Sequence, residues 1–288
     1  MSKHRHDTLR QLFARGAGLI LPGAFNALTA RVIETTGHQV VFVTGAGLAN
    51  GYLGAPDLGL MTVTELAAHV GAMSAAVDLP LFVDADTGFG NALNVRRTVQ
   101  LLEQAGASAI MMEDQTFPKR CGHFDGKSVI PANEMVGKIK AALDARSDHR
   151  MMIVARTDAR AVEGYEAAIA RAHQYHEAGA DALFVEAPPT AEELLSIPKD
   201  VPGIHLCNMV IGGKTPVLPR AALARAGYAG ICYANAALQA AIRAMQQVMS
   251  HLAQEGDLEG VEQLLVSFQD RQKVLAGDAY KELEERYR

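Results

Sequence analysis

Acidic side chains close several short apolar segments of this sequence. Asp84 and Asp86 end one segment, Glu113 and Asp114 end the next, and Glu186 ends a later one. If these segments are strands whose ends meet at one mouth, the carboxylates would raise one another's pKa values unless a cation lay among them. Carboxylate oxygens suit Mg2+, with Mn2+ as a substitute, better than Zn2+. The pattern therefore predicts a divalent-metal site.

An acid at a strand end has a second interpretation, because it can simply cap the helix that follows. The two interpretations are equally good for Asp158, which ends the segment Arg156-Thr157-Asp158. The metal-site interpretation is favoured for Asp84 and Asp86, since two acids so close together can both reach one site. Asn208 ends another apolar segment and is a candidate for substrate binding.

A basic loop around one cysteine follows Glu113. It contains Lys119-Arg120-Cys121-Gly122-His123, whose basic members would lower the pKa of the Cys121 thiol and ready it for proton transfer. Gly122 and Gly126 would let the loop close as a lid that excludes water from a reactive intermediate. The residues alone leave open a simpler alternative, a basic surface loop with an incidental cysteine.

Two glycine-containing segments look at first like nucleotide-binding loops. Neither Gly45-Ala46-Gly47 nor Gly88-Phe89-Gly90 matches G-x-G-x-x-G or a P-loop. We interpret both as tight turns after strands, whose backbone N–H groups approach a substrate carboxylate.

Eight short, near-continuously apolar segments alternate with longer amphipathic stretches. Such alternation is typical of repeated βα units with strands that are covered on both faces. Eight units favour an α/β fold with a closed (β/α)8 barrel of the TIM type, with catalytic groups at the carboxyl ends of the strands. The predicted strands are Leu19–Ala24, Val40–Gly45, Leu81–Asp86, Ala109–Gln115, Met151–Asp158, Ala182–Ala187, Gly203–Met209 and Ala229–Ala234.

Two further helices are predicted after the eighth strand, at about 236–254 and 258–275, followed by a charged tail to Arg288. That is one helix more than a barrel needs, and it either caps the barrel or exchanges with a neighbouring subunit. No linker or second domain is visible. We therefore expect residues 1–288 to form a single barrel domain with a helical extension over about 236–288.

Composition and charge exclude several classes of protein. A net charge of -5 without any long basic run argues against a nucleic-acid partner. No apolar run approaches the roughly 18 residues of a membrane span, and Met1–Arg15 is charged, so we expect a cytoplasmic protein without a membrane partner. The three cysteines cannot form a disulfide framework, and two of them, Cys207 and Cys232, lie inside apolar strands and are expected in the core.

These segments resemble the isocitrate lyase/phosphoenolpyruvate mutase superfamily, specifically its short members, along nearly the whole chain. The most specific segment is Lys119-Arg-Cys-Gly-His123, which makes an incidental Cys121 a poor interpretation. The other segments that carry the resemblance are Leu21-Pro-Gly-Ala-Phe-Asn-Ala-Leu-Thr-Ala-Arg31, Thr44-Gly-Ala-Gly47, Pro56-Asp-Leu-Gly59, Asp84-Ala-Asp-Thr-Gly-Phe-Gly-Asn91, Glu113-Asp-Gln115, Ala155-Arg-Thr-Asp158 and Asn208-Met-Val-Ile-Gly-Gly-Lys-Thr-Pro216.

The resemblance implies roles for particular residues. It implies that Asp84 holds Mg2+, largely through waters, with an outer shell of Asp57, Asp86 and Glu113. It implies that Cys121 protonates a departing carbanion. The residues implied to bind the substrate are Thr44, Gly45, Ala46, Asp84, Gly122, Arg156 and Asn208, and those implied to bind it or to handle protons are Lys119, His123, Arg156 and Glu186. A homotetramer, a dimer of helix-swapped dimers, is also implied and would account for the surplus helix.

The resemblance makes us expect a Mg2+-dependent carbon–carbon lyase that cleaves a 2-hydroxy di- or tricarboxylate to pyruvate and a second carboxylate. The substrate would be 2-methylisocitrate or a 2-alkylmalate such as 2,3-dimethylmalate. Phe42, Met209 and Ala234 differ from the pattern of methylisocitrate lyases, which turns the expectation toward the alkylmalates. The alternatives are a carboxyphosphonoenolpyruvate phosphonomutase, an oxaloacetate hydrolase or decarboxylase, and, outside the enzymes, an oxo-acid-binding sensor.

Overall fold

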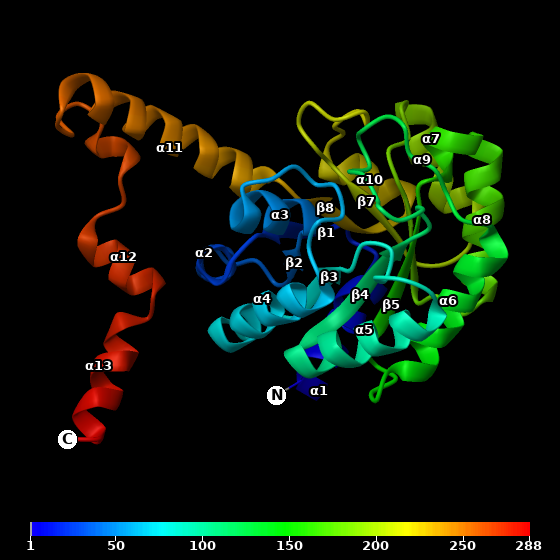
Figure 1. Cartoon of the computed structure of the whole chain (residues 1–288), viewed down its shortest axis with the longest axis horizontal. Helices are drawn as coiled ribbons and strands as arrows, with labels where there is room; N and C mark the ends of the chain where they lie inside the picture. The colour runs from blue at the N-terminus through cyan, green and yellow to red at the C-terminus, as the bar shows by residue number, and fades with distance from the viewer. Residues whose placement is uncertain (1) are drawn as a thin grey trace.

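Eight parallel strands close into a barrel in the computed structural model, which describes residues 2–288 (Figure 1). Each strand pairs with the next along the chain, and the last pairs with the first, for example through Leu21 and Cys232. The (β/α)8 prediction is therefore confirmed. The strands are β1 (Leu19–Ala24), β2 (Val41–Val43), β3 (Leu81–Asp84), β4 (Ala107–Glu113), β5 (Met152–Thr157), β6 (Ala182–Val185), β7 (His205–Asn208) and β8 (Tyr228–Tyr233).

The predicted bounds of β1 are confirmed, whereas each of the other seven strands ends before the predicted residue. The clearest correction concerns Gly45-Ala46-Gly47, which is not a turn but the first turn of a helix. Strand β2 ends at Val43 because the side chain of Thr44 accepts a hydrogen bond from the backbone N–H of Gly47 and caps that helix. The helix N-terminus therefore points its free N–H groups toward the barrel mouth, as a site for an anion requires.

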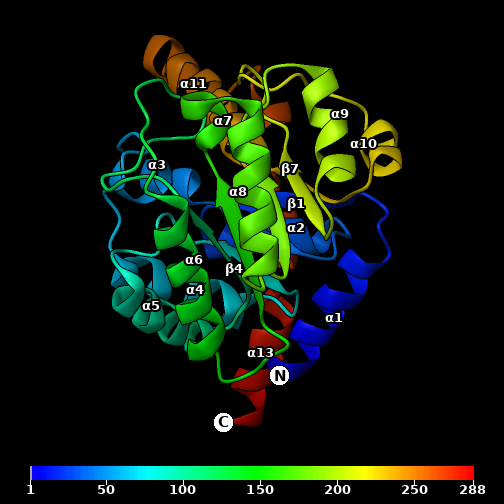
Figure 2. The ribbon, with the colours of Figure 1, turned by 90° about the vertical axis from the view of Figure 1, so that its right-hand side faces the viewer.

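Helices surround the barrel, and α1 lies at the opposite end of it from α7 and α11 (Figure 2). Leu9 and Phe13 of α1 are buried against inward-facing strand residues such as Phe82, so α1 closes the barrel at its amino end. The helices are α1 (Ser2–Ala14), α2 (Ala27–Thr35), α3 (Gly45–Leu53), α4 (Val63–Ala76), α5 (Ala92–Ala105), α6 (Ala132–Ala145), α7 (Ala159–Glu163), α8 (Tyr165–Glu177), α9 (Ala191–Asp200), α10 (Arg220–Ala226), α11 (Ala236–Glu255), the 3-10 helix η1 (Glu262–Leu264), α12 (Phe268–Val274) and α13 (Gly277–Arg286).

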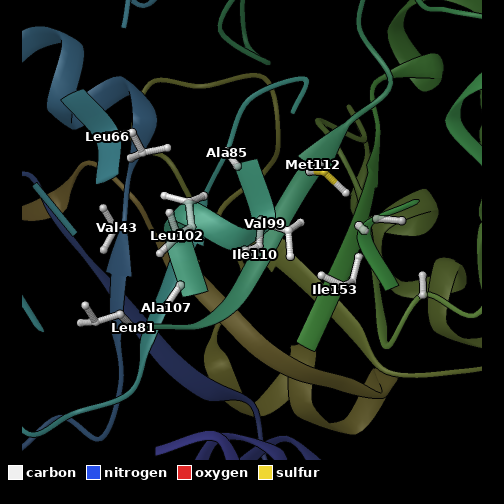
Figure 3. Packing of buried hydrophobic residues seen from close by; sticks show 14 of the residues in the cluster. Val43, Leu66, Leu81, Ala85, Val99, Leu102, Ala107, Ile110, Met112 and Ile153 are labelled. Carbon is white, nitrogen blue, oxygen red and sulfur yellow. The ribbon is translucent and has the colours of Figure 1, made fainter. Parts of the chain in front are cut away.

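The strands carry two apolar layers, because successive side chains point into and out of the barrel. Outward residues such as Ile110 and Met112 pack beneath the helices with Val99 and Leu102 (Figure 3). Inward residues, including Phe42, Met111 and Phe184, fill the interior together with Cys232. Cys207 is buried between β7 and its neighbouring helices, so both predicted core cysteines are confirmed.

The C-terminal segment extends away from the barrel from α11 onward (Figure 1). The predicted helix at about 236–254 is confirmed, but the one at about 258–275 is wrong: that stretch forms the short η1 and α12, and α13 follows in place of a plain charged tail. Large apolar side chains remain exposed here, among them Met245, Met249 and Phe268. No helix within residues 2–288 combines the length and the apolar character needed to cross a membrane.

Candidate active site

The carboxyl ends of the strands enclose a cavity that brings the predicted site residues together. Its remaining volume is about 30 Å³, enough for one or two water molecules, so the loop around Cys121 is closed over the mouth in this structure. A substrate with several carbons needs that loop to move. The lining residues are Phe42, Thr44, Ala46, Asp57, Asp84, Met111, Cys121, Gly122, His123, Arg156, Phe184, Glu186, Asn208, Cys232, Ala234 and Asn235.

Asp84 and Asp86 form the acidic centre beside this cavity. A Cβ atom on Gly45 would lie 3.0 Å from Asp86 Oδ1 and 3.2 Å from Asp84 Oδ2, so both carboxylates converge on the start of α3. Burial, with the charge of Asp86, raises the pKa of Asp84 to about 6. Burial also raises the pKa of Glu113, whose Oε1 is buried without a hydrogen-bond partner. Buried carboxylates this close together keep their negative charges only where positive charge offsets them.

Lys119 supplies part of that positive charge. Its Nζ donates to Asp57 Oδ1 and lies 2.9 Å from Asp86 Oδ1, and the side chain is almost fully buried. Although burial opposes the charge, Asp86 and Asp57 raise the pKa of Lys119 well above its usual value. Lys119 is therefore a fixed cation between two acids in this closed arrangement, and a role for it in proton handling stays a prediction.

The donor set fits Mg2+ bound through few direct protein ligands. Asp84 lines the cavity together with Asp57 and Glu186, and the unpartnered Oε1 of Glu113 can accept from a metal-bound water. Mg2+ usually keeps several waters and takes only one or two carboxylates. No group of three or more His, Cys, Asp or Glu within the described residues is arranged to hold a metal directly.

Arg156, at the end of β5, is the central cation of the cavity. It donates to Asp158 from Nε (2.8 Å) and Nη2 (3.1 Å), and it lies 3.2 Å from Glu113 Oε2 and 3.7 Å from Glu186 Oε2. Asp158 does not cap α7, because its side chain makes no capping bond, and it accepts from Arg156 and Lys127 instead. Burial opposes the charge of Asp158, but Arg156 and Lys127 hold its pKa down at about 2. Asp158 therefore positions Arg156.

Hydrogen bonds join the two ends of the loop around Cys121 and connect the loop to Asp57. Thr116 N–H donates to the Ser128 carbonyl at 2.9 Å, and the Gln115 side chain exchanges two hydrogen bonds with the backbone of Arg120. Farther along, the Cys121 N–H donates to the Asp57 carbonyl at 3.2 Å. These bonds place Cys121 over the acidic centre.

The prediction of a lowered thiol pKa is wrong. Burial raises the pKa of Cys121, and the nearby charges of Asp57 and Glu186 add to that effect. The basic neighbours do not offset it, because Lys119 turns toward Asp57 and Asp86 instead. A thiol that stays protonated at neutral pH is suited to donate a proton rather than to attack as a thiolate.

His123 and Glu186 form the wall opposite the acidic centre. The Lys214 N–H donates to His123 Nδ1 at 3.1 Å, so the proton of the neutral ring lies on Nε2, which faces Glu186 Oε1 at 3.5 Å. Burial lowers the pKa of His123 and favours this neutral form. Gly122 packs against Glu186, and both line the cavity.

Several lining residues escaped the sequence prediction, although a signal for some of them was present. Met111 and Phe184 lie two residues before Glu113 and Glu186, so strand alternation alone points them into the barrel. Asn235 also lines the cavity and lies two residues after the end of β8 at Tyr233. Lys127, which lies in the loop around Cys121, and Lys214, which contacts that loop, carry no comparable signal in the sequence.

A family model described as phosphoenolpyruvate phosphomutase matches residues 9–253. The chain belongs to this family. It is 42% identical to 2,3-dimethylmalate lyase of Eubacterium barkeri, over 97% of this chain and 96% of that protein. It is 43% identical to 2-methylisocitrate lyase of Aeropyrum pernix, over 86% and 80% of the two chains.

Solved structures of the family superpose closely on this barrel. A crystal structure of 2,3-dimethylmalate lyase, described as a member of the PEP mutase/isocitrate lyase superfamily, has a TM-score of 0.92 and 31% identity over 98% of this chain and 95% of that chain. Phosphonopyruvate hydrolase in complex with oxalate and Mg++ has a TM-score of 0.89 and 31% identity over 98% and 99%. The family member described here is accordingly an enzyme that makes or breaks carbon–carbon bonds, which sets aside the oxo-acid sensor.

Proposed function

We propose that this enzyme is a Mg2+-dependent lyase that cleaves a 2-hydroxy dicarboxylate, such as 2,3-dimethylmalate, to pyruvate and a second carboxylate. The observation that carries the proposal is the position of the Cys121 thiol, which lines one closed cavity together with Arg156 and Asp84. The relatives named 2,3-dimethylmalate lyase and 2-methylisocitrate lyase support the reaction type.

One set of cavity residues acts on the 2-oxo acid portion of the substrate, and another acts on the departing fragment. When bound by Asp84 and by waters held by Asp57, Asp86 and Glu113, Mg2+ would supply the positive charge that favours loss of the 2-hydroxyl proton. Arg156 and the N–H groups of Gly45 and Ala46, at the start of α3, bind the carboxylate of the 2-oxo acid portion.

Cys121 completes the reaction at the departing fragment. A carboxylate of the cavity takes the hydroxyl proton, the bond between C2 and C3 breaks, and its electrons pass to the departing fragment as an aci-carboxylate. The Cys121 thiol gives that carbon its proton, and one proton returns to the Cys121 thiolate after the products leave. The closed loop excludes water while the carbanion exists, and Glu186 with His123 forms the surrounding wall.

The charges of the cavity favour a dicarboxylate over a tricarboxylate. Among the lining residues that the structure describes, Arg156 is the one Lys or Arg, and burial favours the neutral form of His123. A third carboxylate would enter this site without a matching charge, which is costly. Part of the remaining wall is apolar and suits short alkyl substituents; the residues of that part are Phe42, Met111, Phe184, Cys232 and Ala234.

The test is a comparison of kcat/KM for 2,3-dimethylmalate and threo-2-methylisocitrate, with pyruvate measured through lactate dehydrogenase. We expect the dicarboxylate to be preferred by about 10-fold or more, the factor that one uncompensated polar group is typically worth. A preference for the tricarboxylate would contradict the proposal. Release of oxalate from oxaloacetate would indicate the hydrolase alternative. Conversion of carboxyphosphonoenolpyruvate, followed by phosphorus NMR, would indicate the phosphonomutase alternative.

The proposal includes two predictions that rest on the sequence, a cytoplasmic location and a homotetramer of helix-swapped dimers without nucleic-acid or membrane partners. The extended C-terminal segment with exposed Met245, Met249 and Phe268 supports the swapped assembly, since such side chains gain from burial against a second copy. Light scattering of the purified protein measures the assembly directly.

A further inference from the structure

We propose that Lys127 is a positioning residue that fastens the loop around Cys121 in its closed position. Its Nζ donates to the Gly122 carbonyl at 2.5 Å and to Asp158 Oδ1 at 2.8 Å, so one ammonium group joins the loop to the end of β5. The inference rests on the proposed role of Cys121, because a closed loop matters to the reaction only if that thiol takes part.

The course of the chain explains how Lys127 reaches this place. The loop leaves the barrel after Gln115 and returns at Val129, where the two residues form an antiparallel bridge. Gly126 has a φ of +76°, a conformation that glycine adopts without strain, and it turns the chain just before Lys127. The side chain can then reach back under the loop to the carbonyl next to Cys121.

The side chain of Lys127 is buried, so its ammonium group depends on these two hydrogen bonds rather than on solvent. Its side chain is 2% exposed and that of Asp158 is 0% exposed. A buried ammonium group is retained only where it is paired and hydrogen-bonded. If the loop opens, Lys127 moves with it and loses its bond to Asp158, one of its two acceptors.

Asp158 couples loop closure to the alignment of Arg156. Its Oδ1 accepts from both Lys127 and Arg156 Nη2, and its Oδ2 accepts from Arg156 Nε. The buried Asp158 carboxylate therefore accepts from two cations, Lys127 of the loop and Arg156 of the substrate-binding wall. Closing the loop adds the Lys127 bond to the same carboxylate that orients Arg156.

The experiment compares Lys127→Met, Lys127→Arg and wild type, with Lys140→Met as the matched control because Lys140 is exposed on α6. Loop opening is measured as the rate at which iodoacetamide modifies Cys121. Cys207 and Cys232 are buried, and Cys121→Ser gives the background. The second readout is kcat and KM for 2,3-dimethylmalate with Mg2+.

We expect Lys127→Met to be modified at least about 10-fold faster, the factor that a hydrogen bond from a charged donor is typically worth. Its kcat should fall by about 10- to 100-fold, as for a catalytic group displaced by about an ångström, with Lys127→Arg restoring part of both. Lys140→Met should match wild type. An unchanged rate of Cys121 modification in Lys127→Met would overturn the proposal, whatever happens to kcat.

Two further outcomes are distinguished. If wild type cleaves no substrate, the lyase proposal fails, while the modification rates still decide whether Lys127 holds the loop. If Lys127→Met also exposes Cys207 and Cys232 to the reagent, it has unfolded, and Lys127→Gln takes its place. Lys127→Gln loses the charge and must then be modified faster than Lys127→Arg, and equal rates would overturn the proposal.

Discussion

The backbone of Gly122 lies against the carboxylate of Glu186, so closely that a Cβ atom on residue 122 would come within 2.3 Å of Glu186 Oε1. Gly122→Ala must therefore push the loop or Glu186 out of place. We expect kcat/KM to fall by about 100-fold, because a shift of about an ångström at a reacting group costs roughly that much. Steady-state kinetics on the variant measures the loss.

Gly137→Ala is the control for that substitution. Gly137 lies inside α6, and an added Cβ there meets nothing within 4 Å. Alanine should leave the activity unchanged and stabilise the protein by about 0.5–1 kcal/mol, since glycine is a poor helix former. Equal activity of the two variants would show that Gly122 and Glu186 are not held in contact in solution.

Replacing Cys121 by serine should remove the proton donor without removing the site. A hydroxyl is a much weaker acid than a thiol, so we expect kcat to fall by about 10²- to 10⁴-fold, the usual contribution of a general acid. Oxalate should still bind, because Arg156 and the start of α3 are untouched. Calorimetry with oxalate checks the binding, and unchanged turnover would exclude Cys121 as the donor.

The reactivity of Cys121 should depend on pH in a way that reports its burial. Burial raises the pKa of the thiol, so its protonated form persists to higher pH than in a free cysteine. Iodoacetamide attacks the thiolate, so the modification rate should rise with pH through a midpoint above about 8.5, the ordinary value. If the midpoint for Cys121 lay below that of glutathione under the same conditions, the thiol pKa would be lowered, as the basic residues of the loop suggested, and the effect of burial would be contradicted.

Removal of divalent metal should abolish cleavage, and Mg2+ should restore it, with Mn2+ as a substitute. Asp84→Asn keeps the size of the side chain but removes its charge, so the Mg2+ concentration for half-maximal activity should rise by roughly 100-fold or more, the upper end of what a lost supporting contact costs. Asp144→Asn, on the exposed face of α6, should require no more Mg2+ than wild type. Full activity in a metal-free enzyme would contradict a Mg2+ role.

Much of the site could be predicted because a barrel delivers the carboxyl ends of its strands to one place. Asp84, Glu113, Arg156, Glu186 and Asn208 were identified on that rule, and four of them line the cavity while Glu113 pairs with Arg156. The same strand alternation that points Glu113 inward would also have found Met111. Local sequence is enough where position along a strand decides the direction of a side chain.

The remainder depends on how a long loop folds, which local sequence does not specify. The basic neighbours of Cys121 suggested a lowered pKa, but Lys119 turns away to Asp57 and Asp86, residues that are distant in sequence. The turn expected at Gly45 became a helix, because Thr44 caps it with its own side chain. The bonds of Lys127 likewise appear only once the loop and β5 lie side by side.

The most direct test of the central claim is proton NMR of 2,3-dimethylmalate incubated with the Mg2+-loaded enzyme and, separately, with Cys121→Ser. Cleavage between C2 and C3 with protonation of the departing carbon predicts pyruvate and propionate in equal amounts from the wild type. The serine variant should form both products at least about 100-fold more slowly. Absence of pyruvate from the wild-type reaction, or equal rates for the two proteins, would contradict the account.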